Sequence, residues 1–366
     1  MTSSIPVQQG RHVWSGTELA QSTDWITTFT ASEADDVLSA LAAARSSGKP
    51  LEQIRRTDFP LPRLQAKFQA LSRELESGRG FVLVRGLDLQ GLSDDQCRTL
   101  FWGLGLQLGA PLSQSKLQNY IAEVRNIGEA MGQATTRAYR AGGPLRFHTD
   151  QCDVLALLCV REAISGGESR VVSSAAIHNA VLERRPDLLA ELRGPFFFSR
   201  QGEEYGDELP WYERPIFDTE QGFFTSIFSR SYIESAQRMA QVPRLTGPQQ
   251  EAIEFVSRLA DELSVTIELR KGDMQFFNNH VTYHSRTDYE DHEDVAKRRT
   301  QLRLWLATPG SRPLPPGACT FFGDSRPGVF RGGVTPPSGR RFAFADWESA
   351  GWQPADLRAF GAGHAA

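Results

Sequence analysis

Cysteine is scarce in this sequence: the 366 residues include only four. They stand at positions 97, 152, 159 and 319, and no two are spaced as C-x-x-C, the pattern of zinc ribbons and thioredoxin-like redox sites. Four cysteines are also too few for a disulfide framework in a chain of this length, which favours a reducing, cytoplasmic setting. The opening residues, MTSSIPVQQGRHVW, lack the basic and apolar regions of a secretory signal.

Long apolar runs and an excess of basic charge are missing as well. No run approaches the ~20 apolar residues that a membrane-spanning helix needs, so no membrane partner is expected. Lys and Arg number 40 against 44 Asp and Glu, a net charge of -4, which argues against a nucleic-acid partner. The composition is that of an ordinary globular protein, and whether the chain forms a homo-oligomer stays open.

The pattern along the chain changes from helical to β. A helix is expected to begin with Ser32 as its N-cap, because apolar residues then recur at helical spacing. Residues 80–86, GFVLVRG, are typical of a short buried strand. Helical insertions are expected at residues 175–192 and 247–263. Further strands are expected at residues 153–160, 169–173, 196–199, 223–228, 265–269, 274–278 and 301–307.

Many short strands with long excursions between them favour a sandwich or jelly roll over a doubly wound parallel sheet. No strand is followed by a dinucleotide-binding glycine fingerprint. The expected fold is mainly β with helical additions: a double-stranded β-helix (jelly roll) core flanked by helices. We expect an N-terminal helical extension over 1–79, the core with its lid loops over 80–310, and a C-terminal extension over 311–366 whose end is disordered.

Histidine is also scarce, with seven residues in the chain. His148 and Asp150 stand two apart just before a predicted strand, and in an extended segment their side chains point the same way. This spacing is weak evidence alone, because His292 and Asp294 repeat it. That second copy lies in the highly charged stretch DYEDHEDVAKRR, which is typical of a solvated loop.

A third candidate ligand comes from residues 271–286, KGDMQFFNNHVTYHSR. His284 is far enough from His148 to lie on another strand of the same jelly roll, and His280 is the alternative in this segment. Two histidines and one carboxylate on one face of a metal, with open positions beside them, form the facial triad of non-haem Fe(II) oxygenases.

Two arginines follow in RRTQLRLWLA. Arg299 and Arg303 are four apart, so in a strand they share a face, whereas Leu302, Leu304 and Leu306 face the opposite way. Arginines on a buried face are costly unless they meet an anion, and a carboxylate is a usual partner. Exposed charges on an edge strand are the alternative interpretation.

Over about residues 80–310, the sequence resembles the taurine dioxygenase / 2,4-dichlorophenoxyacetate dioxygenase (TauD/TfdA-like) family. The resemblance is carried by four motifs in the correct order: HTD, GGES, NNHVTYH and RRTQLR. That family uses Fe(II), 2-oxoglutarate and dioxygen. The resemblance implies that His148, Asp150 and His284 are the catalytic metal ligands. The family's Asn five residues before the distal ligand corresponds to Asn279 and favours His284 over His280.

The resemblance also implies how the co-substrate is bound. Arg299 would bind the distal carboxylate of 2-oxoglutarate, and Ser169 would supply a hydroxyl where the family commonly has threonine. Arg303 would lie near the co-substrate or the substrate. Related halogenases lack the carboxylate ligand, so Asp150 argues for hydroxylation, although desaturation and demethylation stay open.

The sequence thus predicts a 2-oxoglutarate-dependent dioxygenase that hydroxylates a small organic acid, an amino acid or an amino-acid derivative and releases succinate and CO2. The substrate is expected to be anionic or zwitterionic, and residues 201–212 form a candidate lid. Two alternatives remain: a cupin-type metalloenzyme using another divalent metal without 2-oxoglutarate, and a sensor that binds 2-oxoglutarate or metal without turnover. The candidate substrate contacts are Arg303, Asn119, Tyr120 and Tyr139.

Overall fold

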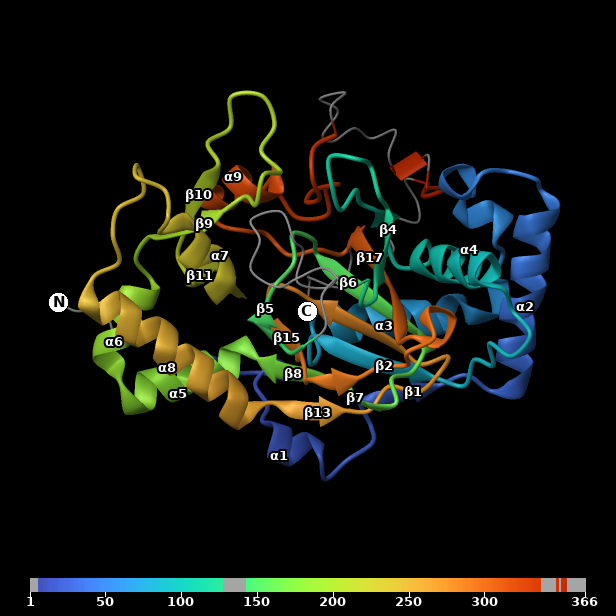
Figure 1. The fold of residues 1–366 in the computed structure, drawn as a ribbon, viewed down its shortest axis with the longest axis horizontal. Helices are drawn as coiled ribbons and strands as arrows, with labels where there is room; N and C mark the ends of the chain where they lie inside the picture. The colour runs from blue at the N-terminus through green and yellow to red at the C-terminus, as the bar shows by residue number, and fades with distance from the viewer. Residues whose placement is uncertain (1–5, 128–142, 337–346, 349, 354–366) are drawn as a thin grey trace.

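Two β-sheets occupy the centre of the molecule and helices surround them (Figure 1). The structure, a computed structural model, describes residues 6–127, 143–336, 347–348 and 350–353. The larger sheet has the strand order β1-β2-β14-β6-β17-β3, and β4 also pairs with β17. Its strands are β1 (Ile26–Thr28), β2 (Phe81–Arg85), β3 (Ala110–Pro111), β4 (Ile121–Val124), β6 (Val154–Arg161), β14 (Met274–Asn278) and β17 (Thr300–Ala307).

The smaller sheet has the order β13-β8-β15-β5. Its strands are β5 (Leu145–His148), β8 (Ser169–Ser173), β13 (Val265–Ile267) and β15 (Thr282–Arg286). Three two-stranded pairs complete the β structure. They are β7 (Ser165–Gly166) with β16 (Tyr289–Glu290), β9 (Phe196–Ser199) with β10 (Trp211–Arg214), and β11 (Phe217–Glu220) with β12 (Phe223–Ser226).

Several of the helices cover the two ends of this β structure. In Figure 1, α5, α6 and α8 gather at one end, and α2 and α4 lie at the other. None of the helices within the described ranges is long and apolar enough to cross a membrane. The helices are α1 (Gly16–Leu19), α2 (Ala31–Ser46), α3 (Gln65–Glu76), α4 (Asp94–Gly105), α5 (Ser174–Arg184), α6 (Pro186–Leu192), α7 (Arg230–Ala236), α8 (Gly247–Leu263) and α9 (Cys319–Phe322).

Helix α2 begins earlier than the prediction placed it. Its N-cap is Thr30, not Ser32: the Thr30 side chain accepts the Glu33 amide, and the Glu33 carboxylate accepts the Thr30 amide. This capping box satisfies two backbone donors at once.

The helical insertion expected as one segment over residues 175–192 is two helices. Arg185 leaves the helical region at φ -147, and Pro186 starts α6. Proline disfavours the helical conformation of the residue before it and suits the first turn of the next helix, which explains the break.

The segments before and after the predicted core are attached to it by specific contacts. Strand β1 pairs in parallel with β2, so the first part of the chain adds an edge strand to the larger sheet. Arg331, from the C-terminal part, is fully buried and hydrogen-bonds Asp153 at the start of β6. Both segments therefore support the sheet that carries β6 and β17.

Candidate active site

The smaller sheet brings His148 and His284 together. They are register partners on the antiparallel strands β5 and β15, and their ring centroids are 4.2 Å apart. Asp150 follows β5 by two residues, and each of the three side chains offers a ligand atom within 4.8 Å of the others. The structure thus assembles the three predicted ligands from positions that are far apart in the sequence.

Hydrogen bonds and stacking orient these side chains. The Nδ1 atom of His148 lies 2.9 Å from the carbonyl oxygen of Arg146, which fixes the proton on Nδ1 and leaves Nε2 as the ligand atom. The backbone N–H of Asp150 donates to Oδ1 of Asn279 at 3.0 Å. The ring of Phe277 stacks on His284 with an interplanar angle of 13°.

The charge states suit a cation. Burial raises the pKa of Asp150, but Arg303 and the two imidazoles lower it more, so the pKa lies below its ordinary value. Burial, reinforced by His148, lowers the pKa of His284 well below its ordinary value. A carboxylate and neutral imidazoles are the forms that bind a divalent metal.

Two buried atoms in this group have no hydrogen-bond partner among the described residues, Oδ2 of Asp150 and Nδ1 of His284. Such orphaned buried groups are costly in an apolar interior. Two nitrogen donors and one carboxylate are also the donor set of non-haem Fe(II) sites. The residues present therefore fit an iron ion.

A first cavity, with an empty volume of about 460 Å³, opens beside the two histidines. Ser169, Arg299 and Arg303 line it as well. Arg299 and Arg303 are only 4% and 7% exposed. Strand β17 has a neighbour on both sides, β6 and β4, so the edge-strand interpretation of these arginines is wrong.

Gly167 makes room for Arg299. Its carbonyl accepts a hydrogen bond from Nη2 of Arg299 at 3.2 Å. The glycine has a φ of +75°, and a Cβ here would lie 2.8 Å from Nε of Arg299. A larger residue would therefore be strained and would displace the guanidinium.

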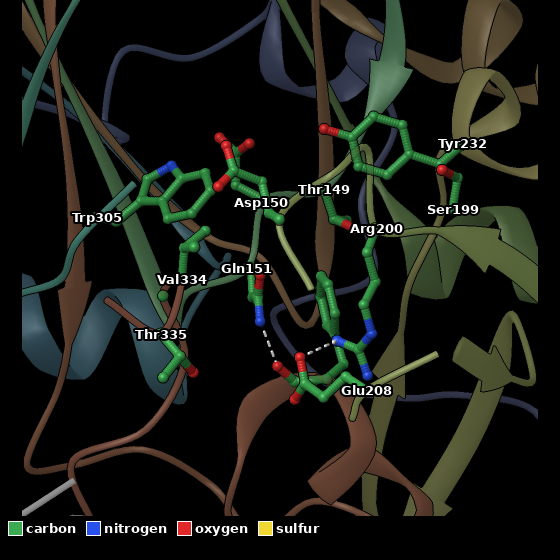
Figure 2. A pocket seen from close by; sticks show the side chains of 13 residues that line it. Thr149, Asp150, Gln151, Ser199, Arg200, Glu208, Tyr232, Trp305, Val334 and Thr335 are labelled. Atoms are coloured by element: carbon green, nitrogen blue, oxygen red, sulfur yellow. Dashed lines mark hydrogen bonds and ion pairs between the residues drawn. The ribbon is translucent and has the colours of Figure 1, made fainter. Parts of the chain in front are cut away.

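A second cavity, with an empty volume of about 540 Å³, lies on the Asp150 side of the group (Figure 2). Asp150 and Trp305 lie next to each other on one side, and the Arg200–Glu208 ion pair, 3.8 Å long, lies on another. The remaining lining residues include Thr149, Gln151, Ser199, Glu203, Tyr232, Phe321, Gly333, Val334 and Thr335.

The four predicted substrate contacts differ in where they lie relative to the cavities. Asn119 is exposed, and Tyr120 packs edge-on against Trp102 at 5.9 Å; neither lines the two cavities described above. Tyr139 lies outside the described residues. Arg303 lines the first cavity, and its Nη1 lies 3.6 Å from Oδ1 of Asp150.

The structure also shows where the candidate lid, residues 201–212, and the alternative metal ligand, His280, lie. From residues 201–212, Glu203 and Glu208 line the second cavity, whereas Tyr212 is buried and stacks on Phe321. His280 is turned to Asp153, with Nε2 2.9 Å from Oδ1, and is not part of the three-residue group.

Sequence reasoning missed some cavity residues. Arg286 and Gln301 line the first cavity, and Val334 and Thr335 line the second. A signal existed for Arg286: it follows His284 by two residues in a strand, so their side chains share a face. Val334 and Thr335 lie in the C-terminal extension, where no local pattern marks them.

Residues 47–305 match the family described as "Taurine catabolism dioxygenase TauD, TfdA family". The chain belongs to this family, and the resemblance inferred from the motifs is confirmed. The protein is thus a non-haem iron, 2-oxoglutarate-dependent oxygenase, and its His-Asp-His group is one that could bind the iron.

Two curated proteins are similar to most of the chain. FR-33289 synthase of Streptomyces rubellomurinus (strain ATCC 31215) is 28% identical over 317 residues, covering 85% of this chain and 93% of that protein. Taurine hydroxylase-like protein SAT17 of Stachybotrys chartarum (strain CBS 109288 / IBT 7711) is 26% identical over 320 residues, covering 81% of each.

Solved structures share the fold at low identity. An asparagine oxygenase in complex with Fe(II), 2S,3S-3-hydroxyasparagine and succinate superposes with a TM-score of 0.62 and 16% identity, covering 78% of this chain and 94% of that one. The non-haem iron oxygenase OrfP in complex with Fe and alpha-ketoglutaric acid gives 0.59 and 14%, covering 77% and 94%.

Proposed function

We propose that this protein hydroxylates a small organic acid, an amino acid or an amino-acid derivative, with release of succinate and CO2. One observation carries the proposal: the His148–Asp150–His284 group contributes residues to the walls of both cavities. The histidines line the first cavity and the aspartate lines the second, so one metal ion would be reached from both. We also infer that the two central sheets are the halves of a double-stranded β-helix.

The first cavity suits 2-oxoglutarate. His148, Asp150 and His284 would hold the iron, which together with 2-oxoglutarate would supply the electrons that activate dioxygen. Arg299 binds the distal carboxylate, and the Ser169 hydroxyl lies in the same cavity to donate to it. Arg303 lies between this cavity and Asp150, where it offsets negative charge.

The second cavity suits a substrate with charge. Arg200, Glu203 and Glu208 line one region of it, so groups of both signs would find a partner. A zwitterion fits this better than a neutral compound. The fold shared with an asparagine oxygenase bound to hydroxyasparagine supports an amino-acid-like substrate.

An anaerobic titration of the metal-free protein tests the proposal. Fe(II) and then 2-oxoglutarate are added while visible absorption is followed, and we expect a weak charge-transfer band only when both are present. Substitution of Arg299→Ala should weaken 2-oxoglutarate binding at least tenfold, because a buried charge-assisted contact is lost. Succinate release is then screened with small acids and amino acids.

A cupin-type enzyme that needs no 2-oxoglutarate would give a different result. The wild type would show no band, and Arg299→Ala would keep its activity. Oxidation of neutral compounds alone would contradict the assignment of a charged substrate.

A further inference from the structure

Arg286 is a third buried arginine in the first cavity, beside Arg299 and Arg303. It is 5% exposed, and Arg299 is 4% exposed. Nε and Nη1 of Arg286 and Nη1 of Arg299 have no hydrogen-bond partner among the described residues. Neither guanidinium forms an ion pair with a carboxylate in the described part of the chain. Buried cations with open donors are costly unless an anion is bound.

The two guanidinium groups are close to one another and to Ser169. Both lie against the ring of Tyr289, with carbon-to-centroid distances of 4.6 Å for Arg286 and 5.4 Å for Arg299. Arg286 and Ser169 are register partners in the β15–β8 pair, so their side chains start from directly opposite positions. All three residues line the first cavity.

The other contacts of Arg286 include no ion pair within the described ranges, although Asp288 and Asp291 are near enough to act on its charge. Its Nη2 donates to the carbonyl oxygen of Gly143. The nearby acid Asp291 uses Oδ1 to accept the backbone N–H of Arg299. A guanidinium is protonated at neutral pH, so Arg286 brings a positive charge into the cavity.

We propose that Arg286 is a second binding residue for the distal carboxylate of 2-oxoglutarate, and that it shares this carboxylate with Arg299. The inference rests on the proposed function, which places the co-substrate in the first cavity. A carboxylate has two oxygens and accepts from two guanidinium groups, so one anion relieves the repulsion between both arginines. The substrate is the less suitable anion, because Arg286 lines the first cavity and not the second.

The test compares two ligands and three substitutions in the full-length, Fe(II)-loaded protein under anaerobic conditions. The dissociation constants of 2-oxoglutarate and of 2-oxobutanoate, which lacks the distal carboxylate, are measured from the visible band. We expect Arg286→Gln to weaken 2-oxoglutarate binding roughly 10- to 100-fold and 2-oxobutanoate binding less than twofold. Arg286→Lys keeps the charge but loses the fork of donors, so an intermediate loss is expected.

Arg214→Gln is the matched control. Arg214 is also buried, at 2% exposed, and also has donors without partners, but it lines neither cavity. It should leave both dissociation constants unchanged. Bound iron and the melting temperature are recorded for every variant, and Arg286→Lys decides the matter if Arg286→Gln does not fold.

Two results would overturn the inference. One is a 2-oxoglutarate dissociation constant within twofold of wild type in both Arg286 variants. The other is an equal loss for the two ligands, which would indicate a structural role. If the wild type binds no 2-oxoglutarate, the proposed function itself fails. If Arg299→Ala weakens 2-oxoglutarate binding but the Arg286 variants do not, only the inference about Arg286 fails.

Discussion

Asn279 connects the metal-binding group to the strand behind it through three hydrogen bonds. Its side-chain oxygen accepts the Asp150 N–H at 3.0 Å, its side-chain nitrogen donates to Sγ of Cys152 at 3.1 Å, and its backbone N–H donates to the Asp153 carbonyl at 3.0 Å. Three positions of one short segment are thus tied to a single residue. Asn279 acts by positioning Asp150, since it is not itself a ligand.

We predict that Asn279→Ala lowers Fe(II) affinity roughly 10- to 100-fold, the usual effect of losing a partner that orients a ligand. Affinity is measured by anaerobic competition with a chelator. Asn278→Ala is the control: Asn278 is equally buried but donates to the carbonyl oxygen of Leu75, so it should affect stability and not iron binding. Equal iron affinities in the two variants would contradict the prediction.

Residue-scale prediction from sequence works where chemistry and spacing coincide. His148 and Asp150 could be paired because they are two residues apart. His284 could be chosen as the third ligand because it lies in a motif with Asn279. Asn119 and Tyr120 line neither described cavity and stay predictions as substrate contacts, because no pattern in the sequence distinguishes a cavity wall from a surface loop. The direction in which a loop side chain points depends on the rest of the fold, which local sequence does not contain.

At the scale of elements, the C-terminal segment is bound to the segment that carries Asp150. Gly333 donates its N–H to the carbonyl oxygen of Gln151 at 2.7 Å, and Val334 donates to that of Ser113 at 2.8 Å. Nε of Arg331 lies 2.9 Å from Oδ1 of Asp153, and both side chains are almost completely buried. These contacts place residues 333–335 as a wall of the second cavity.

We predict that Arg331→Met destabilises the protein by about 3–5 kcal/mol, because it leaves the Asp153 carboxylate buried without its guanidinium partner. Urea unfolding of the metal-free protein measures the loss. Arg326→Met is the control in the same segment: the Arg326–Asp324 pair involves an arginine that is 75% exposed, so its loss should cost less than about 1 kcal/mol.

A loss below about 1 kcal/mol in Arg331→Met would show that the buried pair does not hold the segment. An equal loss in both variants would attribute the effect to the segment's composition and not to the contact with Asp153.

Elements with local signals were predicted well, and elements defined by distant contacts were not. Strand β14 and helix α8 match their predicted bounds, since apolar periodicity and end signals lie within them. The C-terminal segment was predicted only as an extension of the core. Its role as a cavity wall depends on Arg331 meeting Asp153, 178 positions away, and a single sequence carries no signal for that pairing.

At the scale of the whole molecule, buried charge links the N-terminal, central and C-terminal parts. Arg312 donates from Nε to Oε1 of Glu76 at 2.6 Å, at the end of α3, and from Nη1 to the carbonyl oxygen of Phe224. Arg331 donates to the carbonyl oxygen of Arg312 and to Asp153, which is in turn bound to His280. The stability of the whole chain therefore depends on the protonation of groups inside this network.

We predict that the free energy of unfolding falls as the pH drops from about 6.5 towards 4. Burial, with smaller contributions from Arg331 and Arg312, lowers the pKa of His280 to about 4, although Asp153 opposes this. Between the ordinary pKa of 6.5 and the lowered value, the unfolded chain binds a proton that the folded protein does not. Stability then decreases on acidification by up to about 1.4 kcal/mol per pH unit for this one group.

Urea unfolding of the metal-free wild type and of His280→Gln at several pH values between 7.5 and 4.5 measures this effect. Both proteins contain the other histidines, so the difference between their slopes isolates His280. Gln keeps a donor for Asp153 but does not titrate, and its curve should be flatter over this range. If the two curves are parallel, the buried imidazole of His280 is not what makes the fold acid-sensitive. The loss of stability then comes from other groups whose pKa values are lowered in the folded protein, such as His12, whose pKa burial lowers to about 4.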